Sequence, residues 1–129
     1  MGVWHYLSNV RLEYLTIWRK ILIKFKKGVK VDGITKECIY AMSVADNYFN
    51  LYLDRDIVVT SVNDGRHMKK SKHYEGNAFD LRTWTTDTSG VQIDKEEKQC
   101  IGTNIYKRLG NKYDLLVEKD HIHIEYDPK

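Results

Sequence analysis

Proline and cysteine are scarce in this chain, and their scarcity excludes whole classes of protein. One proline, Pro128, and two cysteines occur in 129 residues. A small secreted domain held by disulfides would carry more cysteines, so we expect Cys38 and Cys100 to be reduced, buried thiols. The two lie far apart and form no CxxC pair, which argues against a structural zinc site closed by cysteines.

Long apolar runs are also missing. No stretch approaches the ~18 apolar residues of a membrane-spanning helix. Residues 1–30 lack the uninterrupted apolar core and the small-residue cleavage site of a secretory signal, so we expect synthesis in the cytoplasm without a signal peptide. The hydrophobic content of 42% and the charged content of 30% are ordinary for one globular domain with a single core.

Positive charge is concentrated at the N-terminus. Residues 1–30 hold seven Lys or Arg and one acid, Glu13, for a local net charge of +6. Since the whole chain carries +3, the remainder sums to −3. The excess of positive charge is therefore confined to the arm, and no nucleic-acid partner is expected.

Apolar residues recur at helical spacing over residues 4–27, with lysines mainly on the opposite side. We expect a basic amphipathic helix in an N-terminal segment of residues 1–30, ending at Gly28, before a domain of residues 31–129. Such a helix can contact an anionic membrane or cell wall. It can also pack on the domain with its lysines in solvent, which is the interpretation we favour.

The domain itself combines helices and strands. Helices are expected over residues 35–52, with Thr35 as N-cap, and from Asp94 to Gly110. Strands are expected over residues 56–61, 78–81 and 113–117, and after the turn at Lys119 and Asp120. The order predicts an α+β fold with helices packed on one side of a small antiparallel sheet.

Metal-binding side chains gather in two stretches. Ser71 to Arg82 reads S-K-H-Y-E-G-N-A-F-D-L-R, and Val117 to Asp127 reads V-E-K-D-H-I-H-I-E-Y-D. Two imidazoles and one carboxylate, with a fourth position open for water, are the ligand count of a catalytic zinc site. His67, which lies between strands, is interpreted as a surface residue.

The strand period supports this interpretation. On one strand Asp80 points away from its neighbours Phe79 and Leu81. On the other strand His121 and His123 share one face, while the isoleucines beside them share the opposite face. Each strand therefore has an apolar side for the core and a polar side for chemistry.

The pattern S-x-H-x-x-G-x-A-x-D, followed by an H-x-H strand near the end, resembles the zinc D-Ala-D-Ala metallopeptidases. This family includes D,D-carboxypeptidases, vancomycin-resistance dipeptidases and phage endolysins that cut L-Ala-D-Glu bonds; the hedgehog signalling domain is similar in fold. His73, Gly76, Ala78 and Asp80 match the pattern after Ser71. The resemblance runs from about residue 33 to the end, and the ending D-H-I-H-I-E-Y-D-P-K resembles small phage-encoded members.

The resemblance implies a hedgehog-like fold and a Zn²⁺ ion held by His73, Asp80 and His123. It also implies roles for four further residues. Asp120 is the expected general base, Glu118 is its rival, and His121 and Arg66 are expected to stabilise the oxyanion. Spacing alone leaves two registers open, because Glu118 with His121 and Asp120 with His123 both read acid-x-x-His.

The implied function is a zinc-dependent peptidase that hydrolyses a D-amino-acid-containing amide bond of peptidoglycan peptides. It would act as a carboxypeptidase or as an endolysin, on the cell wall, after phage-type release or as a virion component. The alternative is a catalytically weak or inactive zinc-binding module with a virion or interaction role, because similar sites occur in domains whose main task is binding.

Overall fold

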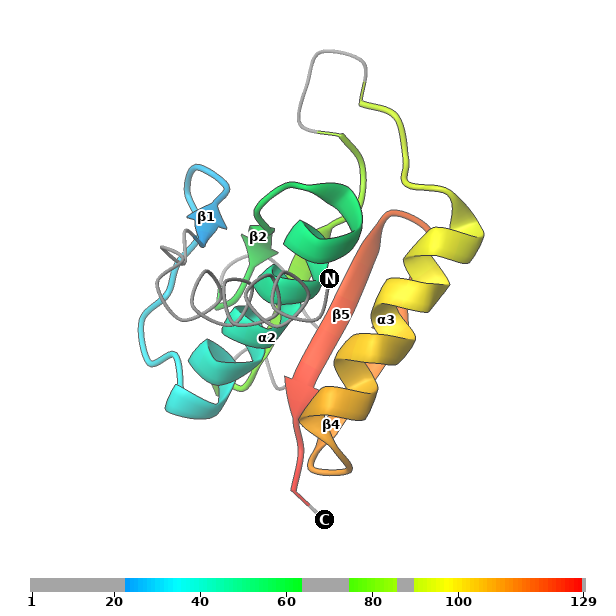
Figure 1. Cartoon of the computed structure of the whole chain (residues 1–129). Helices are drawn as coiled ribbons and strands as arrows, with labels where there is room; N and C mark the ends of the chain where they lie inside the picture. Colours follow the sequence, from blue (N-terminus) through cyan, green and yellow to red (C-terminus); the bar gives the residue numbers. More distant parts are fainter. Residues whose placement is uncertain (1–22, 64–74, 86–89, 129) are drawn as a thin grey trace, which may run out of the picture.

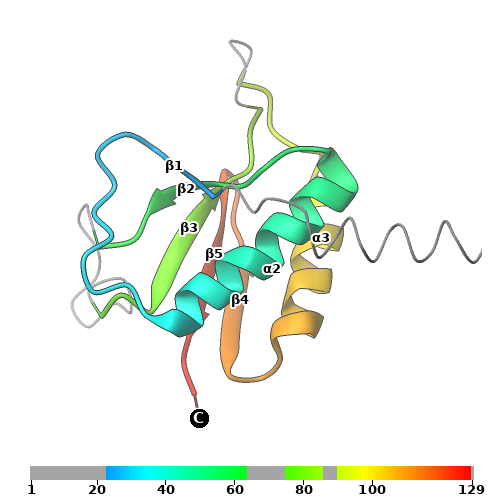
Figure 2. The same cartoon turned by 60° about the vertical axis from the view of Figure 1, so that its left-hand side comes forward.

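The computed structural model describes residues 23–63, 75–85 and 90–128. In chain order these residues form β1 (Lys24–Phe25), α2 (Lys36–Leu53), β2 (Val58–Ser61), β3 (Ala78–Arg82), α3 (Lys95–Leu109), β4 (Tyr113–Val117) and β5 (His121–Tyr126). The strands make one five-stranded mixed sheet in the order β1-β2-β3-β5-β4. Both helices lie on one face of that sheet (Figures 1 and 2). The predicted α+β class is therefore confirmed.

One edge of the sheet differs from the antiparallel arrangement that we predicted. β1 runs parallel to β2, whereas the other neighbouring strands are antiparallel. The helix predicted up to residue 27 is wrong for residues 23–27, and residues 1–22 lie outside the described part of the chain. Main-chain bonds explain the difference: Lys24 N–H donates to Ile57 O (3.3 Å) and Lys26 N–H to Val59 O (2.9 Å). For residues 23–27, hydrogen bonding to β2 outweighs the weak helical preference of the sequence.

The helix boundaries follow the predicted caps. The Thr35 hydroxyl accepts a bond from Cys38 N–H (3.3 Å) at the start of α2. The Asp94 carboxylate accepts from the N–H groups of Glu96 (3.1 Å) and Glu97 (3.4 Å) at the start of α3. Each cap satisfies backbone donors that have no partner within the helix.

The core fills the space between the helices and the sheet. Its largest fully buried side chains come from both layers and include Met42, Phe49, Phe79, Leu81, Ile101, Ile105, Ile122 and Ile124. The side chains on one face of β3 and β5 therefore pack in the core, as the period-two pattern of the two strands predicted. Residues 78, 80 and 82 of β3 and residues 121, 123 and 125 of β5 share the face away from the helices.

Gly76 brings the chain into β3 through a close backbone crossing. Its φ is +71°, and a Cβ added there would collide with the carbonyl of Gly33. The Gly76 carbonyl also accepts a bond from Thr35 N–H (3.1 Å). Glycine is needed here for both its conformation and its lack of a side chain.

The two cysteines have different environments. Both are free thiols; Cys38 is buried, and burial raises its pKa to about 11. Cys100 is exposed on α3, so the prediction that both are buried is wrong for Cys100. Among the described helices, none is both long and apolar enough to cross a membrane.

Candidate active site

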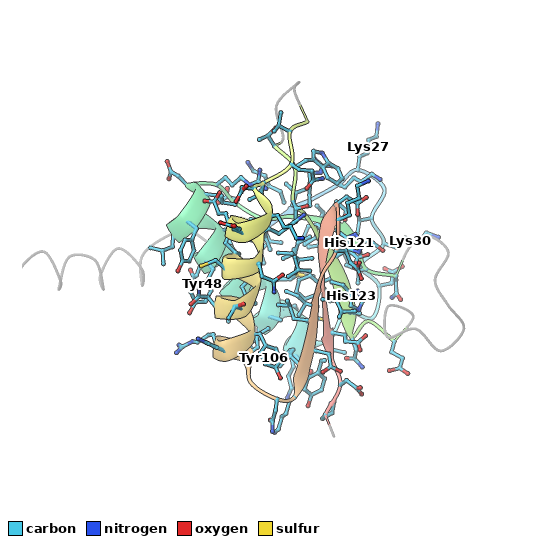
Figure 3. All side chains as sticks on the ribbon, turned by 90° about the vertical axis from the view of Figure 1, so that its right-hand side faces the viewer. Lys27, Lys30, Tyr48, Tyr106, His121 and His123 are labelled. Atoms are coloured by element: carbon cyan, nitrogen blue, oxygen red, sulfur yellow. The ribbon has the colours of Figure 1, made fainter. Side chains whose placement is uncertain are left out.

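The register of β3 and β5 brings the two sequence motifs together. Asp80 pairs directly with His123, and Arg82 with His121. His121 and His123 are half-buried, while Ile122 and Ile124 between and beside them are fully buried. Both imidazoles lie on the side of the sheet away from α3 (Figure 3). This face is therefore where two distant stretches of chain join their polar side chains.

Asp80 and His123 form the centre of the site. His123 Nδ1 lies 2.9 Å from Asp80 Oδ1, and the two side chains are 18% and 17% exposed. The other ring nitrogen, Nε2, lies 3.1 Å from Glu125 Oε2. Burial lowers the pKa of His123, but the hydrogen bonds to Asp80 and Glu125 raise it more, so that the net shift is upward.

The contact with Glu125 favours Nδ1 of His123 as the nitrogen that binds a metal. A carboxylate that accepts a bond from Nε2–H leaves the lone pair on Nδ1. That nitrogen faces Asp80. Glu125 thus holds the His123 ring in one orientation. A carboxylate commonly supports a metal-binding histidine through its other ring nitrogen in this way.

His121 and Asp120 make a second pair beside the first. His121 Nδ1 lies 2.7 Å from Asp120 Oδ1, and His121 Nε2 lies 3.9 Å from Asp80 Oδ1. The hydrogen bond to His121 lowers the pKa of Asp120, against a smaller opposite effect of burial. The Asp120 side chain is 66% exposed and carries a negative charge at neutral pH.

The turn between β4 and β5 separates the two candidate bases. Glu118 N–H donates to His121 O (2.8 Å), which closes the hairpin, and Lys98 Nζ of α3 donates to Lys119 O (2.7 Å), which anchors it. Asp120 follows this turn and lines a cavity with Asp80 and His121. Glu118 is exposed and is not among the residues that line this cavity.

That cavity measures about 250 Å³ and opens on the polar face of the sheet. Four residues that the motifs did not single out help to line it: Lys26, Thr60, Arg82 and Trp84. Arg82 could have been found from the sequence, because it shares the alternation of Ala78 and Asp80. Lys26 could not, since its position depends on β1, which the sequence did not indicate.

Two of the three predicted zinc ligands, Asp80 and His123, lie in the described part of the chain and are in contact. In a tetrahedral site with metal–ligand bonds of about 2.0–2.1 Å, neighbouring donor atoms lie ~3.3 Å apart. The Asp80–His123 distance of 2.9 Å is shorter than this value, so the two side chains would separate slightly to admit the ion. The third predicted ligand, His73, and the predicted oxyanion residue Arg66 lie outside the described part of the chain.

An acidic triad shares Glu125 with this centre. Asp114, Glu125 and Asp127 bring one carboxylate oxygen each within 4.8 Å of the others, so the triad could hold a metal ion. Within the described ranges it is the one group of three such donors that meets this distance. Oxygen ligands alone suit hard cations such as Ca²⁺ and Mg²⁺ better than Zn²⁺.

Comparison with models of known protein families, with curated proteins and with solved structures gives no match for this chain.

Proposed function

We propose that the chain is a zinc-dependent peptidase that hydrolyses a D-amino-acid-containing amide bond of peptidoglycan peptides. The observation that carries this proposal is the contact of His123 Nδ1 with Asp80 Oδ1 at 2.9 Å, on an open face beside a cavity. The two residues come from the two motifs that resemble the zinc D-Ala-D-Ala metallopeptidases. A hedgehog-like fold is part of the same proposal.

Asp80 and His123 would hold the ion together with His73. The site is half-buried and lies next to a cavity, as a centre that must admit a peptide requires. A zinc ion bound there would activate a water as the nucleophile by lowering its pKa to near 7. Glu125 keeps the His123 ring in the orientation that presents Nδ1.

Asp120 and His121 would carry the proton and the charge. A carboxylate oxygen of Asp120 takes the proton released as water attacks the amide carbonyl and returns it to the leaving nitrogen. His121 donates a hydrogen bond to the carbonyl oxygen as it becomes negative. Their contact of 2.7 Å supports this division of roles because it holds both side chains at the cavity.

The test combines metal analysis with digestion of cell-wall material. Purified peptidoglycan fragments are incubated with the zinc-loaded protein, with the chelated protein and with the protein after zinc is restored, and the products are identified by mass spectrometry. We expect cleavage that is lost with chelator and recovered with zinc. About one zinc per chain without any cleavage would support the alternative, a zinc-binding module with an interaction role. Absence of zinc after reconstitution at neutral pH would contradict both.

Action on the cell wall, after phage-type release or from a virion, belongs to the same proposal. The exposed lysines of the segment that leads into α2 favour contact with an anionic polymer or membrane. Lys27 and Lys30 lie on the same side of the sheet as His121 and His123 (Figure 3). Such a surface would hold an anionic cell wall near the site.

A further inference from the structure

Arg82 stands out among the residues around the cavity because one of its donors is buried without a partner. It lies two residues beyond Asp80 on the same face of β3 and pairs with His121. Its Nε is buried and makes no hydrogen bond within the described part of the chain. A buried donor without an acceptor costs about 1–3 kcal/mol. Arg82 as a whole is half-buried and lines the cavity, so the terminal nitrogens of its guanidinium are the donors that a ligand there can meet.

The side chain of Arg82 is held in place from one side. Its guanidinium carbon lies 4.9 Å from the centre of the Trp84 ring, within the range of a cation–π contact. Arg55 donates from Nη1 to the Trp84 carbonyl (3.0 Å) and so fixes the backbone of the residue that supports Arg82. An arginine restrained in this way loses little conformational freedom when it binds a ligand.

A second cation faces the same space. Lys26 lines the cavity from the end of β1, where its N–H bonds to Val59 O. Asp80 and His121 line the same cavity. Two cationic side chains and the proposed ligand Asp80 therefore line one volume of about 250 Å³.

We propose that Arg82 and Lys26 form a subsite for a carboxylate of the substrate, next to the amide bond that is cut. The planar guanidinium matches a carboxylate geometrically, and bonds between charged partners are stronger than neutral ones. The subsite selects peptides with a free carboxylate over the same peptides with a carboxamide. The inference rests on the proposed function, because that function places the scissile amide at Asp80 and His123.

The kinetic test uses one pair of peptides that differ in a single group, a free C-terminal carboxylate or a carboxamide. We expect the zinc-loaded full chain to favour the carboxylate by about 10- to 100-fold in kcat/KM, the range set by one charged hydrogen bond. Arg82→Gln should bring this ratio close to one, Arg82→Lys should restore part of it, and Lys26→Gln should reduce it several-fold. Lys24→Gln is the matched control, because Lys24 lies two residues earlier on β1, its Nζ is 3.8 Å from Asp56 Oδ2, and it does not line the cavity.

The binding test needs no catalysis. The NMR signal of Arg82 Nε–H is followed in the metal-free full chain during titration with N-acetyl-D-alanine and, separately, with its carboxamide. We expect a saturable shift with the acid and none with the amide.

The two tests separate the subsite from the peptidase. Equal cleavage of the two peptides, a preference that survives Arg82→Gln, or an Arg82 signal that the acid does not shift would overturn the subsite and leave the peptidase standing. A saturable shift without cleavage of either peptide would support the subsite while the proposed function fails. The Lys26→Gln variant and the NMR titration do not require an Arg82 variant to fold. They therefore test the subsite even if Arg82→Gln and Arg82→Lys are unfolded.

Discussion

Thr35 and Gly76, 41 residues apart in the sequence, are joined by two hydrogen bonds to one carbonyl. The Thr35 N–H (3.1 Å) and the Thr35 hydroxyl (3.3 Å) both donate to Gly76 O. Thr35 is also the N-cap of α2. The start of α2 is thereby bonded to the chain four residues before Asp80. The same two hydrogen bonds therefore position both the helix and the strand that carries Asp80.

We predict that Gly76→Ala lowers the free energy of unfolding by roughly 3 kcal/mol or more. The new Cβ would meet the Gly33 carbonyl, and the positive φ would be strained as well. Gly90→Ala is the control, since Gly90 also has positive φ (+60°) but has open space around it. It should cost only about 1–2 kcal/mol. Urea unfolding of both variants measures the difference, and equal losses would contradict the role of the crossing.

The two histidines of β5 should respond differently to removal. His123→Ala takes away a proposed ligand and should leave the site without zinc at micromolar metal. His121→Ala should keep the zinc and slow turnover by ~10²–10³, the usual loss for one oxyanion donor. Metal analysis after gel filtration, together with kcat, distinguishes them. Zinc lost in His121→Ala and kept in His123→Ala would establish the opposite register.

The two acids before the histidines should also differ. Asp120→Asn should keep the zinc and lose most of the rate, ~10²–10⁴, as for a general base. Glu118→Gln should have a small effect, because Glu118 is exposed and does not line the cavity with Asp80 and His121. Steady-state kinetics on one peptide at fixed zinc measures both. A greater loss in Glu118→Gln than in Asp120→Asn would transfer the role of base to Glu118.

The pKa of His123 predicts opposite pH dependences for the metal-free and metal-bound protein. Its folded-state pKa is raised above the ordinary 6.5, so the bonds of its protonated ring stabilise the metal-free fold fully below pH 6.5. This contribution is lost as pH rises through the folded pKa. Thermal unfolding of chelated wild type and His123→Gln should therefore differ most at acidic pH.

Zinc binding should show the reverse trend. The metal must displace the proton from His123, so affinity should increase as pH rises through the same pKa. A competition titration with a fluorescent chelator between pH 5.5 and about 8 tests this sign. Affinity that is flat across this range would show that His123 does not exchange a proton for the metal.

Truncations should separate the N-terminal arm from the sheet. Removal of residues 1–22 keeps β1 and should leave turnover of small peptides largely intact while weakening attack on whole cell walls. Removal of residues 1–27 takes away the strand Lys24–Phe25 and the cavity residue Lys26 and should cost both stability and small-peptide turnover. Circular dichroism and peptide kinetics on the two truncated chains provide the comparison. Collapse of turnover in the shorter deletion, with the protein folded, would place the arm within the active domain.

The strands β3 and β5 were predictable from the sequence because apolar and polar residues alternate along them at every second position. Ile122 and Ile124 must enter the core, so the face of His121 and His123 follows from the pleat. The caps at Thr35 and Asp94 were predictable for a similarly local reason, since the side chain bonds to donors two or three residues away. Asp80 and His123 could be assigned to one site through two motifs read together.

What depends on distant pairing could not be predicted in this way. β1 has two residues, too few to show a period, and exists because β2 offers it an edge. The place of Lys26 in the cavity follows from that pairing. The choice between Asp120 and Glu118 likewise depends on the shape of one turn, which acid-x-x-His spacing does not encode.

The alternation of β5 makes the protein tolerant of one kind of genetic change and intolerant of another. A substitution of Ile122 by another aliphatic residue alters packing on one side and leaves the imidazoles on the other. The insertion or deletion of one codon within β5 exchanges the two sides from that point on, which drives an imidazole into the core and exposes isoleucine. Variants of this chain should therefore accumulate aliphatic exchanges in β5 freely, while its length in residues stays constant.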